Sequence, residues 1–176
     1  NPPYINKVGY NNLDLSVKGY EPKVALCGGV DGYTLEKDKL FDSYDLYSDA
    51  ETEEVDYIIQ GPAMSNVTDS TAKAQKMLDL AATRKDCMAF ISPPRDNVIG
   101  VPSVNTIVDR VIEFFDSLSS TSYGVFDNNY KYIYDKYNDK YRYIACNADV
   151  AGLTLSTALN QEAWFSPAGF NRGQLR

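Results

Sequence analysis

Three short apolar runs, each closed by glycine or proline, alternate with segments of helical periodicity, and this alternation limits the folds open to the chain. The runs are residues 23–27, 55–59 and 87–91, and a fourth, weaker run follows at 123–126. Runs of this length and composition are typical of strands buried on both faces. Strands that alternate with amphipathic helices predict an α/β domain with a mostly parallel central sheet flanked by helices on both faces.

Two strong helices are expected between these strands, and a short one is indicated by the spacing within residues 40–47. The first has Asp69 or Ser70 as its cap and an apolar stripe at Ala74, Met77, Leu78, Ala81 and Ala82. The second has Ser103 as its cap and one apolar face formed by Val104, Ile107, Val108, Val111, Ile112, Phe115 and Leu118.

The 176 residues suit one domain. Residues 1–21 are polar, contain Pro-Pro and Asn-Asn, and show weak alternation, so they are expected to form an extended arm. Residues 22–176 are then a single α/β core domain. Because the chain starts with Asn1 and ends at Arg176 without a clear stop signal, we expect it to be an internal piece of a longer protein.

Tyrosine is concentrated in one segment. Six of the fourteen tyrosines lie between residues 129 and 143, mostly at alternate positions, which predicts a half-exposed β-hairpin with a turn at 138–140. Such a ribbon could stack single-stranded bases, but nearby carboxylates would repel phosphates. Contact with another protein is therefore favoured, since tyrosine suits surfaces that are dry on one side and wet on the other.

Charge is concentrated as well. Residues 31–56 hold ten acidic and two basic side chains, a net charge of −8, whereas the whole chain carries −7. This balance argues against a broad nucleic-acid surface. It is compatible with a solvated acidic face or with a docking face for a basic partner.

Several kinds of chemistry are excluded by composition. The chain has no histidine, so it can form neither a Ser-His-Asp triad nor an HExxH zinc site. Its three cysteines form no CxxC pair and are expected to be buried in a protein from a reducing compartment. The acidic segment lacks the EF-hand spacing. We therefore expect no enzyme activity, cofactor or metal, and the lack of a long apolar run argues against membrane insertion.

The residues considered so far leave two other functions open. A nucleotide-binding α/β enzyme would place phosphates at the turn that follows the first strand, Gly28-Gly29-Val30-Asp31-Gly32, although this is not GxGxxG and no GxxxxGK[ST] occurs. The second open function is that of a ligand-binding module on a viral or cell surface. A tight turn requiring glycine is the ordinary explanation of the Gly-rich segment.

The C-terminal third carries a recognisable pattern: Ala151-Gly152, then Trp164, then Pro167-Ala168-Gly169 and Arg172-Gly173. With the upstream Gly28–Gly32 turn and the run from Arg84 through Pro93, this order resembles the tail sheath proteins of contractile-tailed bacteriophages, the large myovirus type especially. The resemblance spans residues 24 to 175. Within it, Gly28, Gly29, Asp31, Gly32, Trp164, Pro167 and Gly169 are the candidate structural motif, with Trp164 expected in the core.

The resemblance implies a structural subunit of the virion tail, assembled in the host cytoplasm. Such subunits stack as rings around a tail tube and contract to drive the tube through the host envelope, and baseplate and tail terminator are the further partners implied. Candidate subunit contacts are the acidic residues Glu51, Glu53 and Glu54, the hairpin lysines Lys136 and Lys140, and Arg172. The chain alone, without the family's following segment, is expected to be largely monomeric.

Overall fold

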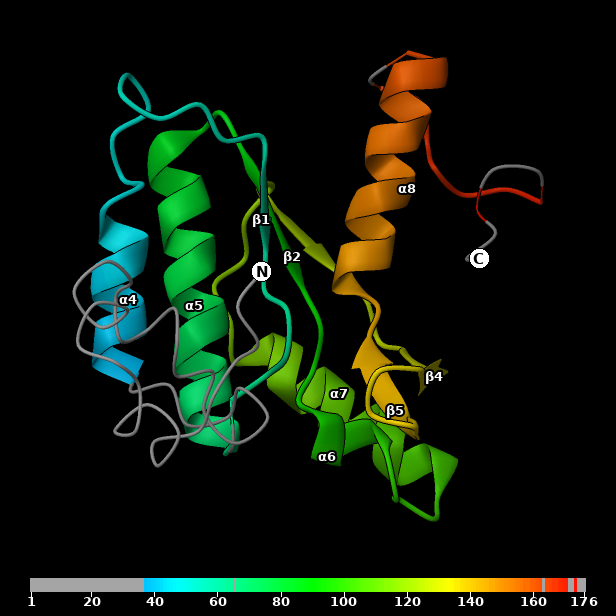
Figure 1. Ribbon diagram of the computed structural model, residues 1–176. Coiled ribbons are helices and arrows are strands. Elements are labelled where there is room, and N and C mark those ends of the chain that lie inside the picture. The colour runs from blue at the N-terminus through cyan, green and yellow to red at the C-terminus, as the bar shows by residue number, and fades with distance from the viewer. Residues whose placement is uncertain (1–36, 65, 163, 171–172, 174–176) are drawn as a thin grey trace, which may run out of the picture. The chain divides into compact units, whose positions relative to one another are not determined.

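The computed structural model describes residues 37–64, 66–162, 164–170 and 173 (Figure 1). The chain divides into two units, Asn1–Asp42 and Ser43–Arg176. Of the first unit, the described part is the beginning of helix α4 (Lys37–Asp45), which agrees with the short helix expected there. The expected arm at 1–21, the strand at 23–27 and the glycine turn at 28–32 lie outside the described residues.

A parallel sheet organises the second unit. Its strands are β1 (Tyr57–Ile59), β2 (Met88–Ile91) and β3 (Gly124–Phe126), in the spatial order β1-β2-β3. Ile58 pairs with Ala89, and Ala89 pairs with Gly124. The parallel sheet and the strands expected near 55–59, 87–91 and 123–126 are thus confirmed.

One face of the sheet is covered by helices α5 (Val67–Arg84) and α7 (Val104–Asp116). The helical stripe of α5 lies against alternate strand residues, which share a face because side chains in a strand alternate. The resulting core comprises Ala74, Met77, Leu78, Ala81, Cys87, Ala89, Ile91, Phe114 and Leu118. This core explains why a glycine stands at position 124: a Cβ there would lie 2.6 Å from Leu78 Cδ2.

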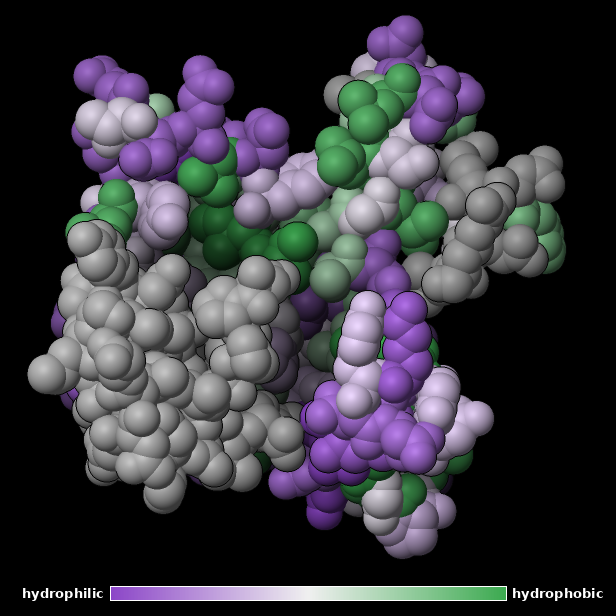
Figure 2. All heavy atoms as spheres, viewed as in Figure 1, coloured by the Kyte–Doolittle hydropathy of each residue, from purple (hydrophilic) through white to green (hydrophobic). Residues whose placement is uncertain are grey.

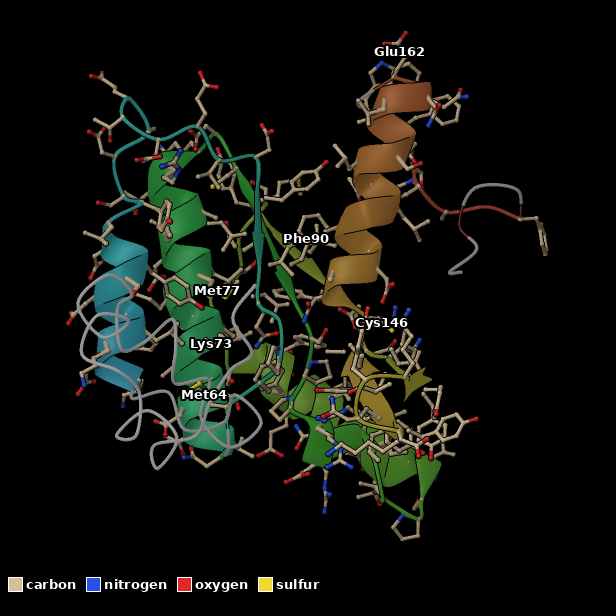
Figure 3. The ribbon with its side chains drawn as sticks, viewed as in Figure 1. Met64, Lys73, Met77, Phe90, Cys146 and Glu162 are labelled. Atoms are coloured by element: carbon tan, nitrogen blue, oxygen red, sulfur yellow. The ribbon has the colours of Figure 1, made fainter. Side chains whose placement is uncertain are left out.

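The opposite face is covered by helix α8 (Asn147–Asn160), which contacts β1 and β2. Tyr57 and Phe90 belong to this face, with their rings edge to face at 5.1 Å between centroids. Phe90 is fully buried, and Figure 3 shows it on the α8 side of the sheet. Helices on both faces agree with the expected architecture.

The tyrosine-rich segment forms an antiparallel hairpin of β4 (Tyr130–Asp135) and β5 (Lys140–Ala145). Its turn comprises residues 136–139, and Asp139 adopts a positive φ of 51°. The hairpin leads directly into α8 (Figure 1). The expected hairpin is confirmed, with its turn beginning two residues before the expected position.

The helices differ from expectation in three respects. The cap of α5 is Asn66, whose side chain accepts a hydrogen bond of 2.7 Å from the Asp69 backbone, and neither Asp69 nor Ser70 is the cap. On α7, Val104, Val108 and Ile112 are exposed, because the helix packs through Val111 and Phe114. Helix α8 and the short helix α6 (Arg95–Val98) were not expected. None of the described helices is long and apolar enough to cross a membrane.

Candidate functional site

The segment after α4 forms an exposed loop, residues 46–56, which we call the acidic loop. It carries Asp49, Glu51, Glu53, Glu54 and Asp56 and no lysine or arginine. Asp49 shapes its tip: one carboxylate oxygen accepts from the Glu51 backbone N–H at 3.0 Å and the other from the Thr52 hydroxyl at 3.1 Å. The side chains of Glu51, Glu53 and Glu54 are exposed. The structure therefore brings these three predicted contact residues together on one solvent-facing loop.

A buried arginine fixes this loop from within. Arg84, near the end of α5, donates to three carbonyl oxygens of or next to the loop, at 2.6 Å (Tyr47), 3.1 Å (Asp49) and 2.6 Å (Glu53). It also holds the Asp86 carboxylate, and this hydrogen bonding lowers the pKa of Asp86. The guanidinium of Arg84 binds the backbone carbonyls of the loop and not its carboxylates. The glutamate carboxylates are therefore not needed to hold the loop, and they remain directed to solvent. Sequence reasoning missed Arg84, although a lone arginine closing an apolar helix stripe was a usable signal.

The carboxyl edge of the sheet is where parallel α/β folds usually bind ligands. Here it holds a cluster of polar side chains that bond to one another or to the backbone of the strand ends, which we call the carboxyl-edge cluster: Gln60, Lys73, Ser92, Asp127 and Asn147. Gln60 Oε1 accepts from the Ser92 backbone N–H at 2.7 Å, and the Ser92 hydroxyl donates to Asp127 at 2.6 Å. Asn147 donates to the Gly61 carbonyl at 2.9 Å and to Ser92 Oγ at 3.0 Å.

Lys73 completes the cluster from α5 (Figure 3). Its ammonium donates to the carbonyl oxygens of Gln60 at 2.7 Å and Pro62 at 2.9 Å. Burial lowers the pKa of Lys73 to about 8, and burial also raises the pKa of Asp127. The hydrogen bonds of the carboxyl-edge cluster join strand ends to helices, so the cluster stabilises the fold. No group of three or more possible metal ligands is found among the described residues.

The hairpin presents a ladder of four half-exposed tyrosines, Tyr132, Tyr134, Tyr141 and Tyr143, which we call the tyrosine ladder. Tyr132 lies directly opposite Tyr143, and Tyr134 lies opposite Tyr141. Tyr132 stacks on Tyr141, with 5.0 Å between centroids and 18° between planes. Half-exposed aromatic rings in such an arrangement suit contact with another protein.

The predicted hairpin lysines lie together at the turn end of this ladder. Lys136 and Lys140 are both exposed, and the Lys136 ammonium lies 5.1 Å from the centroid of the Tyr137 ring. Lys140 pairs in register with Asp135. The hairpin therefore combines exposed rings with two cations at one tip.

The motif around Pro167 forms a tight turn. The Gly173 N–H donates to the Gly169 carbonyl at 2.8 Å, and Gly169 has a φ of 142°, which residues with a side chain rarely adopt. Trp164 stands just before this turn and is 79% exposed, so its expected place in the core is wrong for this structure. No helix stripe or strand alternation surrounds Trp164, and its one ring contact among the described residues is with the neighbouring Phe165, at 5.3 Å between centroids.

Other predicted positions cannot be placed. Gly28, Gly29, Asp31, Gly32, Arg172 and Cys27 lie outside the described residues. Cys87 and Cys146 are buried free thiols, as expected, and burial raises the pKa of both.

Comparison with known proteins finds relatives of one kind. The chain is 32% identical over 169 residues to the tail sheath protein of Enterobacteria phage T4, a match that covers 90% of this chain and 26% of that protein. It is 34% identical over 164 residues to the tail sheath protein of Vibrio phage KVP40, covering 85% and 24%. It is 39% identical over 101 residues to the tail sheath protein of Salmonella phage ViI. No family model matches the chain. The chain spans about a quarter of the length of the curated relatives it matches.

Proposed function

The chain is a homologue of phage tail sheath proteins, and from this we propose that it is a structural segment of a contractile tail sheath in the virion. The observation that carries the proposal is sequence similarity along 90% of the chain to a tail sheath protein. The carboxyl-edge cluster supports a role without catalysis, because at the usual ligand position of the fold its side chains bond to one another and to the backbone of the strand ends.

In this role the parent protein forms stacked rings around the tail tube, in a lattice that can shift between two packings. Contraction then draws on the stored difference between the packings and consumes no nucleotide. Other sheath subunits and the tail tube are the main partners, with the baseplate and the tail terminator at the two ends of the lattice. The parent protein is assembled in the host cytoplasm and acts in the virion.

The acidic loop is the contact surface that we assign within this lattice. Its exposed Glu51, Glu53 and Glu54 face a basic patch on a neighbouring subunit or on the tube, for which Arg172 and the turn lysines Lys136 and Lys140 are candidates. A single exposed ion pair contributes about 0–1 kcal/mol. Repetition over a lattice makes the sum of these pairs significant.

The role is tested with the full-length protein that contains this chain. Expressed alone at high concentration, it should form tubes of uniform diameter in negative-stain images, and mass spectrometry should find it in purified tails. A protein that stays a discrete monomer and is absent from tails would contradict the proposal.

A further inference from the structure

A groove opens at the amino edge of the sheet, on the opposite edge from the carboxyl-edge cluster. It has a volume of about 480 Å³. Its apolar lining comes from the starts of the three strands and from the last turns of α8: Tyr57, Cys87, Met88, Tyr123, Leu155 and Ala158. Figure 2 shows this hollow with hydrophobic side chains between the acidic loop and α8. We call it the amino-edge groove.

One rim of the groove is acidic. Its charge comes from Asp56, the last residue of the acidic loop, because Asp86 in the same lining is paired with Arg84, and Lys85 is the basic residue of the lining. Glu53 and Glu54 precede Asp56 by two or three positions, and Arg84 binds the backbone at Glu53, so the loop is held beside the groove. An apolar floor beside a fixed acidic rim suits an occupant that carries large apolar side chains followed by positive charge.

The chain itself contains a segment of this chemistry. Residues 164–170, which we call the aromatic tail, expose Trp164 at 79% and Phe170 at 100%. In the sequence, residues 163–176 include Arg172 and Arg176 and no acidic residue. Exposed large aromatics followed by arginines are typical of the anchor segments of interfaces.

The tail does not occupy the groove of its own chain. Figure 1 shows it leaving the end of α8 and running along the side of that helix away from β1. Trp164 and Phe170 are absent from the groove lining, and Leu155 of that lining is still 47% exposed. Donor and acceptor are therefore both present and both uncovered in one copy.

We propose that the amino-edge groove of one copy receives the aromatic tail of a second copy. The indole of Trp164 enters the apolar floor, and the positive end of the tail lies along the acidic rim. This contact joins different surfaces on the two copies, so it repeats head to tail and generates rings or helices. The inference rests on the proposed sheath function for its choice of a second copy, and deepens it by naming the two surfaces.

The contact is expected to be weak for an isolated pair. A buried aromatic side chain covers about 150–250 Å², so a short tail stays well below the roughly 1,200 Å² of a stable interface. The isolated chain is then monomeric when dilute, and the contact gains strength only within a lattice.

The experiment uses the one tryptophan of the chain. A synthetic peptide of residues 161–176 is titrated with the full chain carrying Trp164→Phe, so that the indole of the peptide is the sole source of tryptophan emission. Binding should move this emission to shorter wavelength and should saturate. Leu155→Lys, placed in the groove of the W164F chain, should weaken binding at least about tenfold, which corresponds to about 1.4 kcal/mol.

The matched control is Leu159→Lys in the same W164F chain. Leu159 lies one turn further along α8, is 76% exposed and is not part of the groove lining, so binding should change by less than about twofold. Circular dichroism of each variant verifies the fold. Unchanged emission across the titration, or equal loss in the two lysine variants, would overturn the proposal. Either result would leave the sheath role standing, because that role is decided by tubes and purified tails.

Discussion

Arg84 grips the carboxylate of Asp86, two residues further along the chain, with both arms of its fork: Nε lies 3.0 Å from one oxygen and Nη2 lies 2.8 Å from the other. Its remaining donors reach the backbone of the acidic loop. The side chain of Arg84 is fully buried, whereas that of Asp86 is 40% exposed. One residue thus connects the end of α5, the start of β2 and a loop some thirty-five positions earlier.

Arg84→Lys should loosen the acidic loop while leaving the sheet folded. A lysine ammonium lacks the planar guanidinium fork, so it cannot bind one carboxylate and three carbonyls at the same time. We expect amide hydrogen exchange in residues 46–54 to accelerate about tenfold or more. Mass spectrometry of exchanged peptides measures this. Lys76→Met, which removes the surface ion pair with Asp45, is the control and should leave the loop protected. Equal exchange in both variants would contradict the assigned role of Arg84.

Lys73 should make stability depend on pH in the alkaline range. Its pKa is about 8 in the folded chain and 10.5 in an unperturbed lysine, so between these values the unfolded chain binds more protons. Stability should therefore rise as pH increases from 8 towards 10.5, by up to about 3 kcal/mol. Urea unfolding of wild type and Lys73→Met at pH 7, 8, 9 and 10 isolates the effect, because other titrating groups cancel in the difference. A difference that stays constant with pH would refute this.

Gly124→Ala should destabilise the domain by about 1–3 kcal/mol, since its Cβ would overlap Leu78 in a filled core. Gly152→Ala is the matched control: nothing lies within 4 Å of the added Cβ, and the residue is in the interior of α8. That variant should gain about 0.5–1 kcal/mol from helix propensity. Thermal and urea unfolding of the two variants should move in opposite directions, and a common direction would count against the described packing.

Tyr141→Ala should destabilise the hairpin by about 1 kcal/mol, because Tyr141 contacts both Tyr132 and Tyr134. Tyr137→Ala is the comparison, since Tyr137 lies in the turn and is 87% exposed. We expect that second change to alter stability by less than about 0.5 kcal/mol. Near-ultraviolet circular dichroism, which reports the stacked rings, should fall only for Tyr141→Ala.

Reversing charge at Glu51, Glu53 and Glu54 to lysine in the full-length protein should impair tube assembly, because the acidic loop would then repel a basic neighbour. The three side chains are exposed, so the monomer should keep its unfolding midpoint. Turbidity and negative-stain counts of tubes measure assembly. Added salt should weaken assembly of the wild type and narrow its difference from the variant. Wild-type assembly by the triple variant would show that the loop is not a contact.

The sheet could be predicted because its strands are short apolar runs closed by glycine or proline. The apolar stripe of α5 also repeats with clear helical spacing. Helix α8 escaped prediction because Thr154, Ser156 and Thr157 interrupt its apolar positions, and Gly152 weakens its propensity. On α7 the apolar positions are more numerous than the described strands β1 to β3 cover. Val104, Val108 and Ile112 therefore stay exposed, and no periodicity could distinguish them from Val111.

The candidate contact residues also divide into those that the sequence could indicate and those that it could not. A run of carboxylates is visible in the sequence, so Glu51, Glu53 and Glu54 could be assigned to one surface. The anchor of that surface, Arg84, is separated from it by some thirty positions, and only the fold brings it near. The exposure of Trp164 was likewise beyond sequence reasoning, because a tryptophan is equally suited to a core and to an interface.

The hydrogen bonds of Asn147 have a mechanical consequence. This residue begins α8, and its amide is tied to the Gly61 carbonyl after β1 and to the Ser92 hydroxyl after β2. A helix held to a sheet by apolar contacts alone can slide, whereas buried directional bonds must break before it moves. A displacement of α8 is therefore transmitted to both strands at once, and α8, β1 and β2 should move together as one rigid piece.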